Sequence, residues 1–379
     1  MNHFEKPLMI EDSTLREGEQ SPGVVFSVDE KVEIARLLAD VGVDALEVGT
    51  PAMGGPELEA IERLVNEDLD LLLIGWNRGR RSDIEASLRC GLRAVHIGLP
   101  ASDHHLGKKF GKSREWVIET MGELVDFAKG EGAWVSVSAE DSGRADVEFL
   151  VDFAKAVGDA GADRMRMSDT IGVLEPFRAR DLFARVTAEA QIPVQAHMHN
   201  DFGLAAANTL AAVSGGARHI HATVNGLGER AGIASLDEVL MGLERHLGID
   251  HGCRLDAILP VAEFVARASG RSIPANKPIV GQAIFEHESG IHVDGVLKVP
   301  DTFEPFTPET IGTERRIVIG KHSGSSAIQY VLAQAGIEVS REKLSEVTTA
   351  VRYEVTHIKR ALTQAETVRV YESVVEANA

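Results

Sequence analysis

Two patterns of apolar positions alternate along the chain from residue 8 to about residue 247. Short apolar runs are followed by longer amphipathic stretches, and the pair occurs eight times. In residues 27–42, for example, Val32, Ala35 and Leu38 fall on one helical face, and Ser27 precedes them as a helix cap. The short runs predict strands over residues 8–13, 45–49, 71–76, 94–100, 134–139, 164–169, 193–199 and 219–224.

Eight strand–helix units predict an α/β fold of the (β/α)₈ TIM-barrel type, because each parallel strand of such a barrel is followed by a helix. An open, doubly wound sheet usually carries a glycine-rich turn after its first strand, and the sequence has none there. We expect the barrel in residues 1–270. Residues 271–325 lose the period and predict a linker or subdomain, and residues 326–379 predict a small helical C-terminal segment.

The charge balance narrows the class of partner. The chain has 379 residues and a formal net charge of −19, from 39 Lys and Arg against 58 Asp and Glu. Such an acidic surface repels a phosphate backbone, so we expect no nucleic-acid partner. Cys90 and Cys253 make no disulfide framework, which is typical of a reducing compartment. Residues 1–9 lack the apolar core of a signal peptide, and no run approaches the ~20 apolar residues of a membrane span. We therefore expect a cytoplasmic protein without membrane contact.

Clusters of polar residues stand at the ends of the predicted strands. Because the C-terminal ends of all barrel strands meet on one face, which carries the active site in barrel enzymes, these clusters predict a single site. The clusters are DSTLREG at 12–18, EDS at 140–142, SDTIG at 168–172 and HMHND at 197–201.

Two histidines in the last cluster have the spacing of metal ligands. His197 and His199 are two residues apart on a strand, so both imidazoles point to the same face. Two imidazoles and one carboxylate form a common set of ligands for a divalent metal, and Glu17 or Asp12 can supply the carboxylate from the first strand. The alternative is a pair of packed or surface histidines.

Two further features near the eighth strand are less specific. His219 lies at the start of that strand, away from the site, and His221 is expected to line the barrel or to support the site, so we leave both out of the metal set. The loop VNGLGERAG at 224–232 allows close backbone approach to a phosphate or carboxylate, and a simple tight turn is its alternative.

Taken together, the motifs resemble a known family. LREGEQ, followed after ten intervening residues by Lys31, and VQAHMHNDFGLAAAN resemble the paired signatures of the 2-isopropylmalate and homocitrate synthases. VNGLGERAG, SGIHVDG and GKHSG extend the match to about residue 325. Within the family, the segments at 29–54 and 290–298 resemble most the homocitrate synthases of nitrogen fixation. Because the sequence ends near residue 379, we also expect it to lack the regulatory domain of leucine-pathway synthases.

The resemblance implies a metal-dependent Claisen condensation of acetyl-CoA with a 2-oxo acid, 2-oxoglutarate in the first place, followed by thioester hydrolysis to homocitrate and CoA. It implies Mg²⁺ or Mn²⁺ as the metal, with Zn²⁺ or Co²⁺ as alternatives, and a homodimer that exchanges its C-terminal subdomain. It assigns metal binding to Glu17, His197 and His199, and catalysis to Arg16, Glu140 and His292. The remaining implied contacts are substrate binding by Arg16, Ser138, Thr170, Arg144 and Arg166, and acetyl-CoA binding by Gly226, Gly228, Glu229 and Arg230.

Three positions depart from the family pattern. Ile233 stands where many relatives have an asparagine that joins the metal ligands, and Phe303 stands where relatives have a tyrosine. Ser136 replaces an arginine of lysine-pathway homocitrate synthases, so a distal substrate carboxylate needs another partner, such as Arg144 or Arg166. The alternatives to a homocitrate synthase are a 2-isopropylmalate or citramalate synthase, a hydroxyacyl-CoA lyase, and a metal-binding barrel without activity.

Overall fold

The chain divides into two compact units, Met1–Ile273 and Pro274–Ala379. The structure is a computed structural model, and it describes residues 6–377. The segment from which we predict the absence of a signal peptide lies in part outside the described residues. Within the described part, no helix is both long and apolar enough to cross a lipid bilayer.

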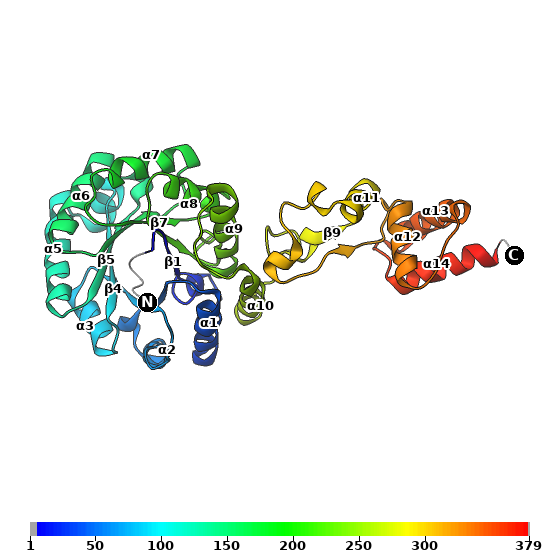
Figure 1. The fold of residues 1–379 in the computed structure, drawn as a ribbon. Helices are drawn as coiled ribbons and strands as arrows, with labels where there is room; N and C mark the ends of the chain where they lie inside the picture. The colour runs from blue at the N-terminus through cyan, green and yellow to red at the C-terminus, as the bar shows by residue number, and fades with distance from the viewer. Residues whose placement is uncertain (1–5, 378–379) are drawn as a thin grey trace. The chain divides into compact units, whose positions relative to one another are not determined.

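Eight parallel strands close into a barrel in the order β1 to β8, which confirms the predicted fold class. The barrel closes where β1 pairs with β8, with Met9 opposite His219. Figure 1 shows the strands inside a ring of helices. The strands are β1 Met9–Asp12, β2 Ala45–Gly49, β3 Leu72–Arg78, β4 Ala94–Pro100, β5 Trp134–Glu140, β6 Arg164–Asp169, β7 Val194–Met198 and β8 His219–Ala222.

Each strand is followed by a helix whose apolar face covers the barrel. Two short segments, α4 Asp103–His105 and a π-helical turn Leu106–Phe110, interrupt the connection between β4 and the next long helix. The long helices of the first unit are α1 Val28–Val41, α2 Gly55–Val65, α3 Arg81–Arg89, α5 Arg114–Gly130, α6 Val147–Asp159, α7 Pro176–Thr187, α8 Ala205–Ser214, α9 Leu236–Leu247 and α10 Ile258–Ser269.

Helix α1 shows how the local sequence sets these boundaries. The Ser27 hydroxyl accepts a hydrogen bond from the Glu30 amide, and the Glu30 carboxylate accepts one from the Ser27 amide, which together form a capping box. Gly42 ends the helix with a φ of 85°, a left-handed conformation that glycine adopts without steric cost. The apolar stripe between these ends is fully buried at Ala35 and Leu38.

The second unit begins with an irregular stretch that also contains regular elements. Two short parallel strands, β9 Glu286–His287 and β10 Arg316–Ile317, pair with each other, and helix α11 spans Gly290–Lys298. The sequence predicts a linker or subdomain here, because this segment has no clean apolar period. Helix α11 has no clear apolar period in its sequence, because it contains two glycines and buries only Val293 and Val296.

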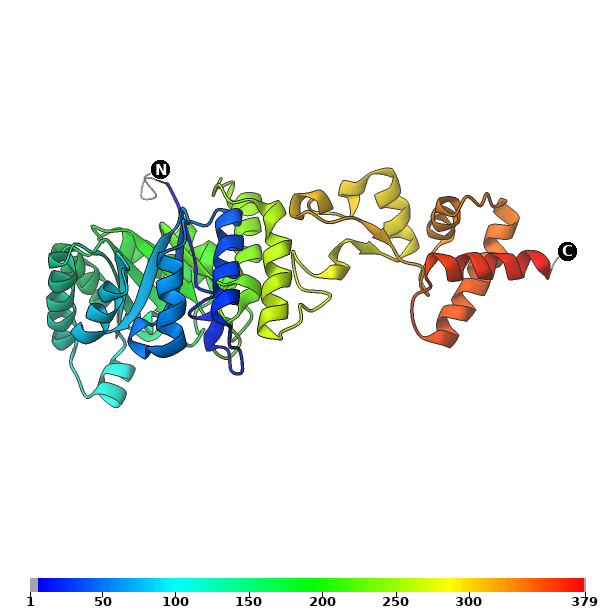
Figure 2. The same cartoon turned by 90° about the horizontal axis from the view of Figure 1, so that it is seen from below.

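Three amphipathic helices complete the second unit, which agrees with the helical C-terminal segment that the sequence predicts. They are α12 Ser325–Gln334, α13 Arg341–Ile358 and α14 Gln364–Glu376. Their apolar faces share a core that includes Ile328, Leu332 and Val347. Figure 2 shows α14, in red, beside the other two helices.

Candidate active site

A small cavity opens at the C-terminal ends of the strands, and most of the residues that line it have polar or charged side chains. Its volume is about 240 Å³. The side chains come from loops and strands that are far apart in the sequence, and the parallel barrel brings them together. The lining residues are Arg16, Glu17, Gln20, Trp76, His96, Ser138, Glu140, Arg166, Ser168, Thr170, His197, His199, Glu229 and Arg230.

Glu17, His197 and His199 lie together in this cavity and can hold a metal ion. The Nε2 atoms of the two histidines are 3.2 Å apart, and the Nε2 of His199 is 3.9 Å from the Oε1 of Glu17. All three residues are buried, and one ligand atom from each lies within 4.8 Å of the other two. Two ring nitrogens facing each other beside a carboxylate oxygen fit a shared divalent cation, so the residues present suit the implied metal.

The protonation states also suit metal binding. Burial holds the pKa of His197 well below its usual range, and the neighbouring imidazoles and guanidiniums act in the same direction. Burial likewise lowers the pKa of His199. Burial alone would raise the pKa of Glu17, but the adjacent Arg16 guanidinium, together with His199 and His221, lowers that pKa below its usual value. Both imidazoles are therefore neutral and the carboxylate is charged near pH 7, which are the forms that bind metals.

Arg16 is fixed by carboxylates rather than left mobile. Its guanidinium donates to Glu17, and its Nε donates to the Oε2 of Glu47 at 2.5 Å. Of the two candidate carboxylates, Glu17 and not Asp12 is the one grouped with the two histidines among the described residues. The Asp12 carboxylate accepts the Thr14 amide at 2.7 Å, and burial raises the pKa of Asp12 to about 7.

Glu140 lies at the end of β5 with its carboxylate at the cavity. Burial raises the pKa of this carboxyl, partly opposed by Lys109 and by Arg16. A raised pKa makes the ionised form a stronger base at neutral pH. The position of Glu140 therefore matches a proton acceptor.

The predicted substrate contacts divide into two sets. Ser138, Thr170 and Arg166 all line the cavity, whereas Arg144 is not among the lining residues. The guanidinium of Arg144 is instead engaged by Asp141, with a shortest distance of 2.7 Å.

The glycine-rich loop contributes two of its four predicted residues to the cavity. Glu229 and Arg230 line it, but Gly226 and Gly228 do not, and the Gly228 amide donates to the Ser21 hydroxyl at 2.8 Å. The last residue of this loop must be a glycine, because a side chain there would clash with the backbone. A side chain on Gly232, which has a φ of 83°, would place its Cβ 1.8 Å from the carbonyl oxygen of Gly226.

Beneath the cavity, the barrel contains a layer of buried charges that sequence reasoning did not assign. Glu11 accepts hydrogen bonds from Arg164 and from the Nη2 of Arg166, the latter at 2.7 Å. Arg166 also pairs with Glu47 at 2.9 Å. The inward positions of such a barrel usually carry branched aliphatic residues. A signal for this layer does exist in the sequence, because polar residues alternate at 164, 166 and 168 and at 195, 197 and 199.

His292 lies in the second unit, on α11. Its ring stacks on Phe303, with centroids 4.2 Å apart and planes 20° from parallel. Phe303 is the residue that replaces the tyrosine of relatives. The two positions singled out from the sequence are thus neighbours within this unit.

Comparisons with known proteins agree with this architecture. The HMGL-like family model matches residues 8–265, and the model of the homocitrate synthase post-HMGL domain-like family matches residues 279–359. The barrel also resembles the crystal structure of hydroxymethylglutaryl-CoA lyase from Pseudomonas aeruginosa, with a TM-score of 0.64 and 21% identity over 74% of this chain and 98% of that one. This likeness concerns the fold alone.

Two curated relatives match over nearly their whole length. "2-isopropylmalate synthase 2" of Caldanaerobacter subterraneus subsp. tengcongensis is 45% identical over 98% of this chain and 97% of the relative. "Homocitrate synthase 1" of Nostoc sp. is 46% identical over 95% of both chains. The chain therefore belongs to the family of 2-isopropylmalate and homocitrate synthases, metal-dependent barrel enzymes that condense acetyl-CoA with a 2-oxo acid.

Proposed function

We propose that the protein is a homocitrate synthase, which condenses acetyl-CoA with 2-oxoglutarate and hydrolyses the thioester to give homocitrate and CoA. The observation that carries the choice of 2-oxo acid is the polarity of the small cavity. Among the described residues, none of those lining it has a purely aliphatic side chain. A substrate with two carboxylates suits such a lining, whereas the isopropyl group of 2-oxoisovalerate would leave polar groups without partners.

His96 is our candidate donor for the distal carboxylate. Its Nδ1 lies 2.8 Å from the Ser136 hydroxyl, and that oxygen already accepts the Nε–H of Arg164 at 3.0 Å. The hydroxyl hydrogen of Ser136 is then free to donate to Nδ1, which leaves the ring hydrogen on Nε2. Burial and the nearby Arg166 hold the pKa of His96 well below its usual range, so the ring is neutral. Within residues 6–377, its buried Nε2 has no hydrogen-bond partner, and His96 lines the cavity.

The side chains around the cation site divide the reaction into steps. A divalent cation held by Glu17, His197 and His199 would supply Lewis acidity to the ketone of the 2-oxo acid. Arg16, fixed by Glu47, stabilises the negative charge that develops on the ketone oxygen. Glu140 removes a proton from the acetyl methyl group, which frees that carbon to attack.

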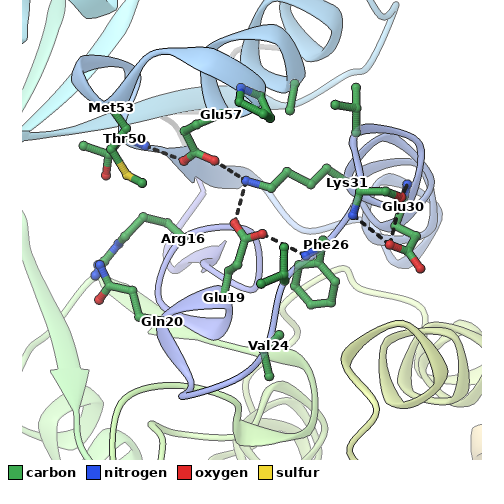
Figure 3. A pocket seen from close by; sticks show the side chains of 15 residues that line it. Arg16, Glu19, Gln20, Val24, Phe26, Glu30, Lys31, Thr50, Met53 and Glu57 are labelled. Carbon is green, nitrogen blue, oxygen red and sulfur yellow. Dashed lines mark hydrogen bonds and ion pairs between the residues drawn. The ribbon is translucent and has the colours of Figure 1, made fainter.

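A second, larger cavity offers a path for the pantetheine arm of acetyl-CoA. It measures about 820 Å³ and shares Arg16 and Gln20 with the small cavity. Figure 3 shows that three of its charged residues bind one another: Lys31 contacts Glu19 at 2.6 Å and also Glu57. The surface left for a ligand is provided by apolar side chains, which suit a chain of methylene and amide groups. They include Val24, Phe26 and Met53.

We further propose a homodimer in which His292 of one copy serves the barrel of the other. His292 lies on α11 outside the barrel unit and presents a ring ordered by Phe303. In this position it assists the hydrolysis of the thioester. Phe303 contributes no hydroxyl to this step, so we assign it only the packing of the His292 ring.

The deciding experiment is an assay of CoA thiol release from acetyl-CoA with Mg²⁺ or Mn²⁺, in which the products are identified by mass spectrometry. We expect the highest kcat/KM with 2-oxoglutarate. A preference for 2-oxoisovalerate would make the protein a 2-isopropylmalate synthase, as the relative at 45% identity is named, and a preference for pyruvate a citramalate synthase. Cleavage of a hydroxyacyl-CoA without condensation would indicate a lyase. Binding of metal and 2-oxo acid without turnover would indicate an inactive barrel.

A further inference from the structure

His221 lies directly behind one of the proposed metal ligands. It belongs to β8 and has no solvent exposure. Its Nδ1 is 2.6 Å from the Nδ1 of His197, and the two rings are tilted by 39° with centroids 4.9 Å apart. On its other side, its Nε2 lies 3.3 Å from a carboxylate oxygen of Glu11 and 3.3 Å from one of Glu47.

The contact between the two histidines holds one hydrogen, and its position decides whether His197 can bind a metal. The Nε2 of His197 faces the Nε2 of His199 and the carboxylate of Glu17. This nitrogen binds a cation only through its lone pair, so the ring hydrogen of neutral His197 must be on Nδ1. His197 then donates to the Nδ1 of His221. The opposite arrangement would place a hydrogen on the Nε2 of His197 and block the cation.

The surroundings of His221 favour the arrangement that permits metal binding. When its Nδ1 accepts from His197, the hydrogen of neutral His221 is on Nε2, between the carboxylates of Glu11 and Glu47. Those carboxylates are already charge-balanced, because Arg164 and Arg166 bind Glu11, and Arg16 and Arg166 bind Glu47. The ring of His221 therefore presents its Nε2–H to these two carboxylates and leaves its Nδ1 to accept from His197.

We propose that His221 is a positioning residue, which keeps His197 in the tautomer that presents Nε2 to a divalent cation. Glu11 and Glu47, in turn, keep His221 in the tautomer that has its hydrogen on Nε2. A metal-binding histidine commonly donates its other ring N–H to a fixed acceptor, and here that acceptor is a second imidazole backed by two carboxylates. The inference rests on the proposed metal site and deepens it.

The same residues do not form a second cation site. Glu11, Glu47 and His221 also have ligand atoms within 4.8 Å of one another. However, Arg164 and Arg166 bind Glu11, and the Oε1 of Glu47 is 2.9 Å from Arg166. A cation placed there would have to displace guanidiniums that are themselves almost fully buried, at 1% and 2% exposure.

The test measures Mn²⁺ affinity of the full-length apoprotein by titration calorimetry, independently of turnover. His221→Leu removes the acceptor and should weaken binding by roughly 10- to 100-fold. His221→Asn places an amide oxygen near the position of Nδ1, so it should keep the affinity within a few-fold of wild type. His219→Gln, a buried histidine two residues away on the same strand, is the matched control and should leave the affinity unchanged.

Wild-type affinity in His221→Leu, or an equal loss in His221→Leu and His221→Asn, would overturn the proposal. In that case His199→Ala still tests the metal site itself. A loss of Mn²⁺ binding in this variant would support the metal site, although His221 would have no role in it. If the wild-type protein binds no Mn²⁺, the proposed metal site and the proposed role of His221 are both wrong.

A second measurement does not depend on the stability of any variant. ¹⁵N imidazole NMR of the Zn²⁺-loaded wild-type protein identifies the protonated nitrogen of each ring. We expect hydrogen on the Nδ1 of His197 and on the Nε2 of His221. Hydrogen on the Nδ1 of His221 would contradict the proposal directly.

Discussion

The carboxylate of Glu140 occupies the space that a side chain at position 98 would fill. A Cβ built on Gly98 would lie 2.5 Å from the Oε1 of Glu140 and 3.4 Å from the Trp76 ring. Gly98 is on β4, directly across from Ser138 of β5. The absence of a side chain on one strand thus sets the position of the proposed base on the next.

Gly98→Ala should displace this base without unfolding the barrel. The flexible end of Glu140 can move away, so we expect wild-type binding of the 2-oxo acid but a kcat reduced roughly 100-fold, since a displacement of about 1 Å can have that effect. Gly122→Ala on α5 is the control, because a Cβ there meets nothing within 4 Å. The measurements are kcat and the affinity for the 2-oxo acid in both variants. An unchanged kcat in Gly98→Ala would show that the position of Glu140 is not critical for the reaction.

Asp12 should make stability depend on pH in an unusual direction. Its pKa rises from 3.8 to about 7 on folding, so between these values the folded state binds more protons than the unfolded state. This carboxyl therefore destabilises the fold as the pH rises through the window, with a slope of at most about 1.4 kcal/mol per pH unit. Asp12→Asn keeps the acceptor for the Thr14 amide and removes the titration.

Urea unfolding of metal-free protein at pH 5 and pH 8 checks this prediction. Other buried groups titrate in the same range, so the quantity to compare is the difference in the free energy of unfolding between Asp12→Asn and wild type. We expect that difference to favour Asp12→Asn increasingly from pH 5 to pH 8. A constant difference would mean that Asp12 stays ionised in the fold.

The sequence predicts the barrel well because its signals are local. Alternating short and long apolar runs reproduce all eight strands, and the capping box at Ser27 and Glu30 marks the start of α1. The predicted metal set is also local in part, because a spacing of two residues at the end of β7 suffices to bring His197 and His199 together. Glu17 joins them because β1 is adjacent to β8 after closure.

The buried charges could not be assigned in the same way, because their partners are remote along the chain. Glu11 meets Arg164 across 153 residues and Gln195 across 184. Strand alternation shows that these side chains point inward, but the pairing depends on the register of a closed barrel. Arg16 is likewise bound by Glu47 from another strand, 31 residues away in the sequence.

His96→Leu should change the choice of 2-oxo acid. If Nε2 of His96 donates to the distal carboxylate of 2-oxoglutarate, loss of a hydrogen bond to a charged group costs about 1.5–3 kcal/mol, or roughly 10- to 100-fold in kcat/KM. Pyruvate lacks that carboxylate and should be used as before. His96→Gln, which offers an N–H in a similar place, should restore part of the loss. Equal losses with both acids would assign His96 a purely structural role.

Met53→Trp tests the path of acetyl-CoA. Met53 lines the large cavity and is 73% exposed. The larger indole ring of Trp at this position therefore narrows the cavity without disturbing the core. We expect the KM for acetyl-CoA to rise roughly tenfold, the equivalent of about 1.4 kcal/mol of lost contact, while the KM for the 2-oxo acid stays the same. Phe177→Trp on α7, 72% exposed and outside both cavities, is the control. An unchanged KM for acetyl-CoA would exclude this cavity.

Mixing two inactive variants tests whether each site draws on two copies of the chain. His199→Ala removes a proposed metal ligand in the barrel, and His292→Ala removes the proposed contribution of α11, so each variant alone should be nearly inactive. In a mixed homodimer with exchanged units, one site receives both defects and the other receives neither. Random exchange makes about half of the dimers mixed, so activity should return to about a quarter of wild type. Size-exclusion chromatography with light scattering measures the dimer, and the assay follows CoA release after the variants are unfolded and refolded together. A dimer that recovers no activity would place His292 at the barrel of its own chain, and a monomer would remove the exchange altogether.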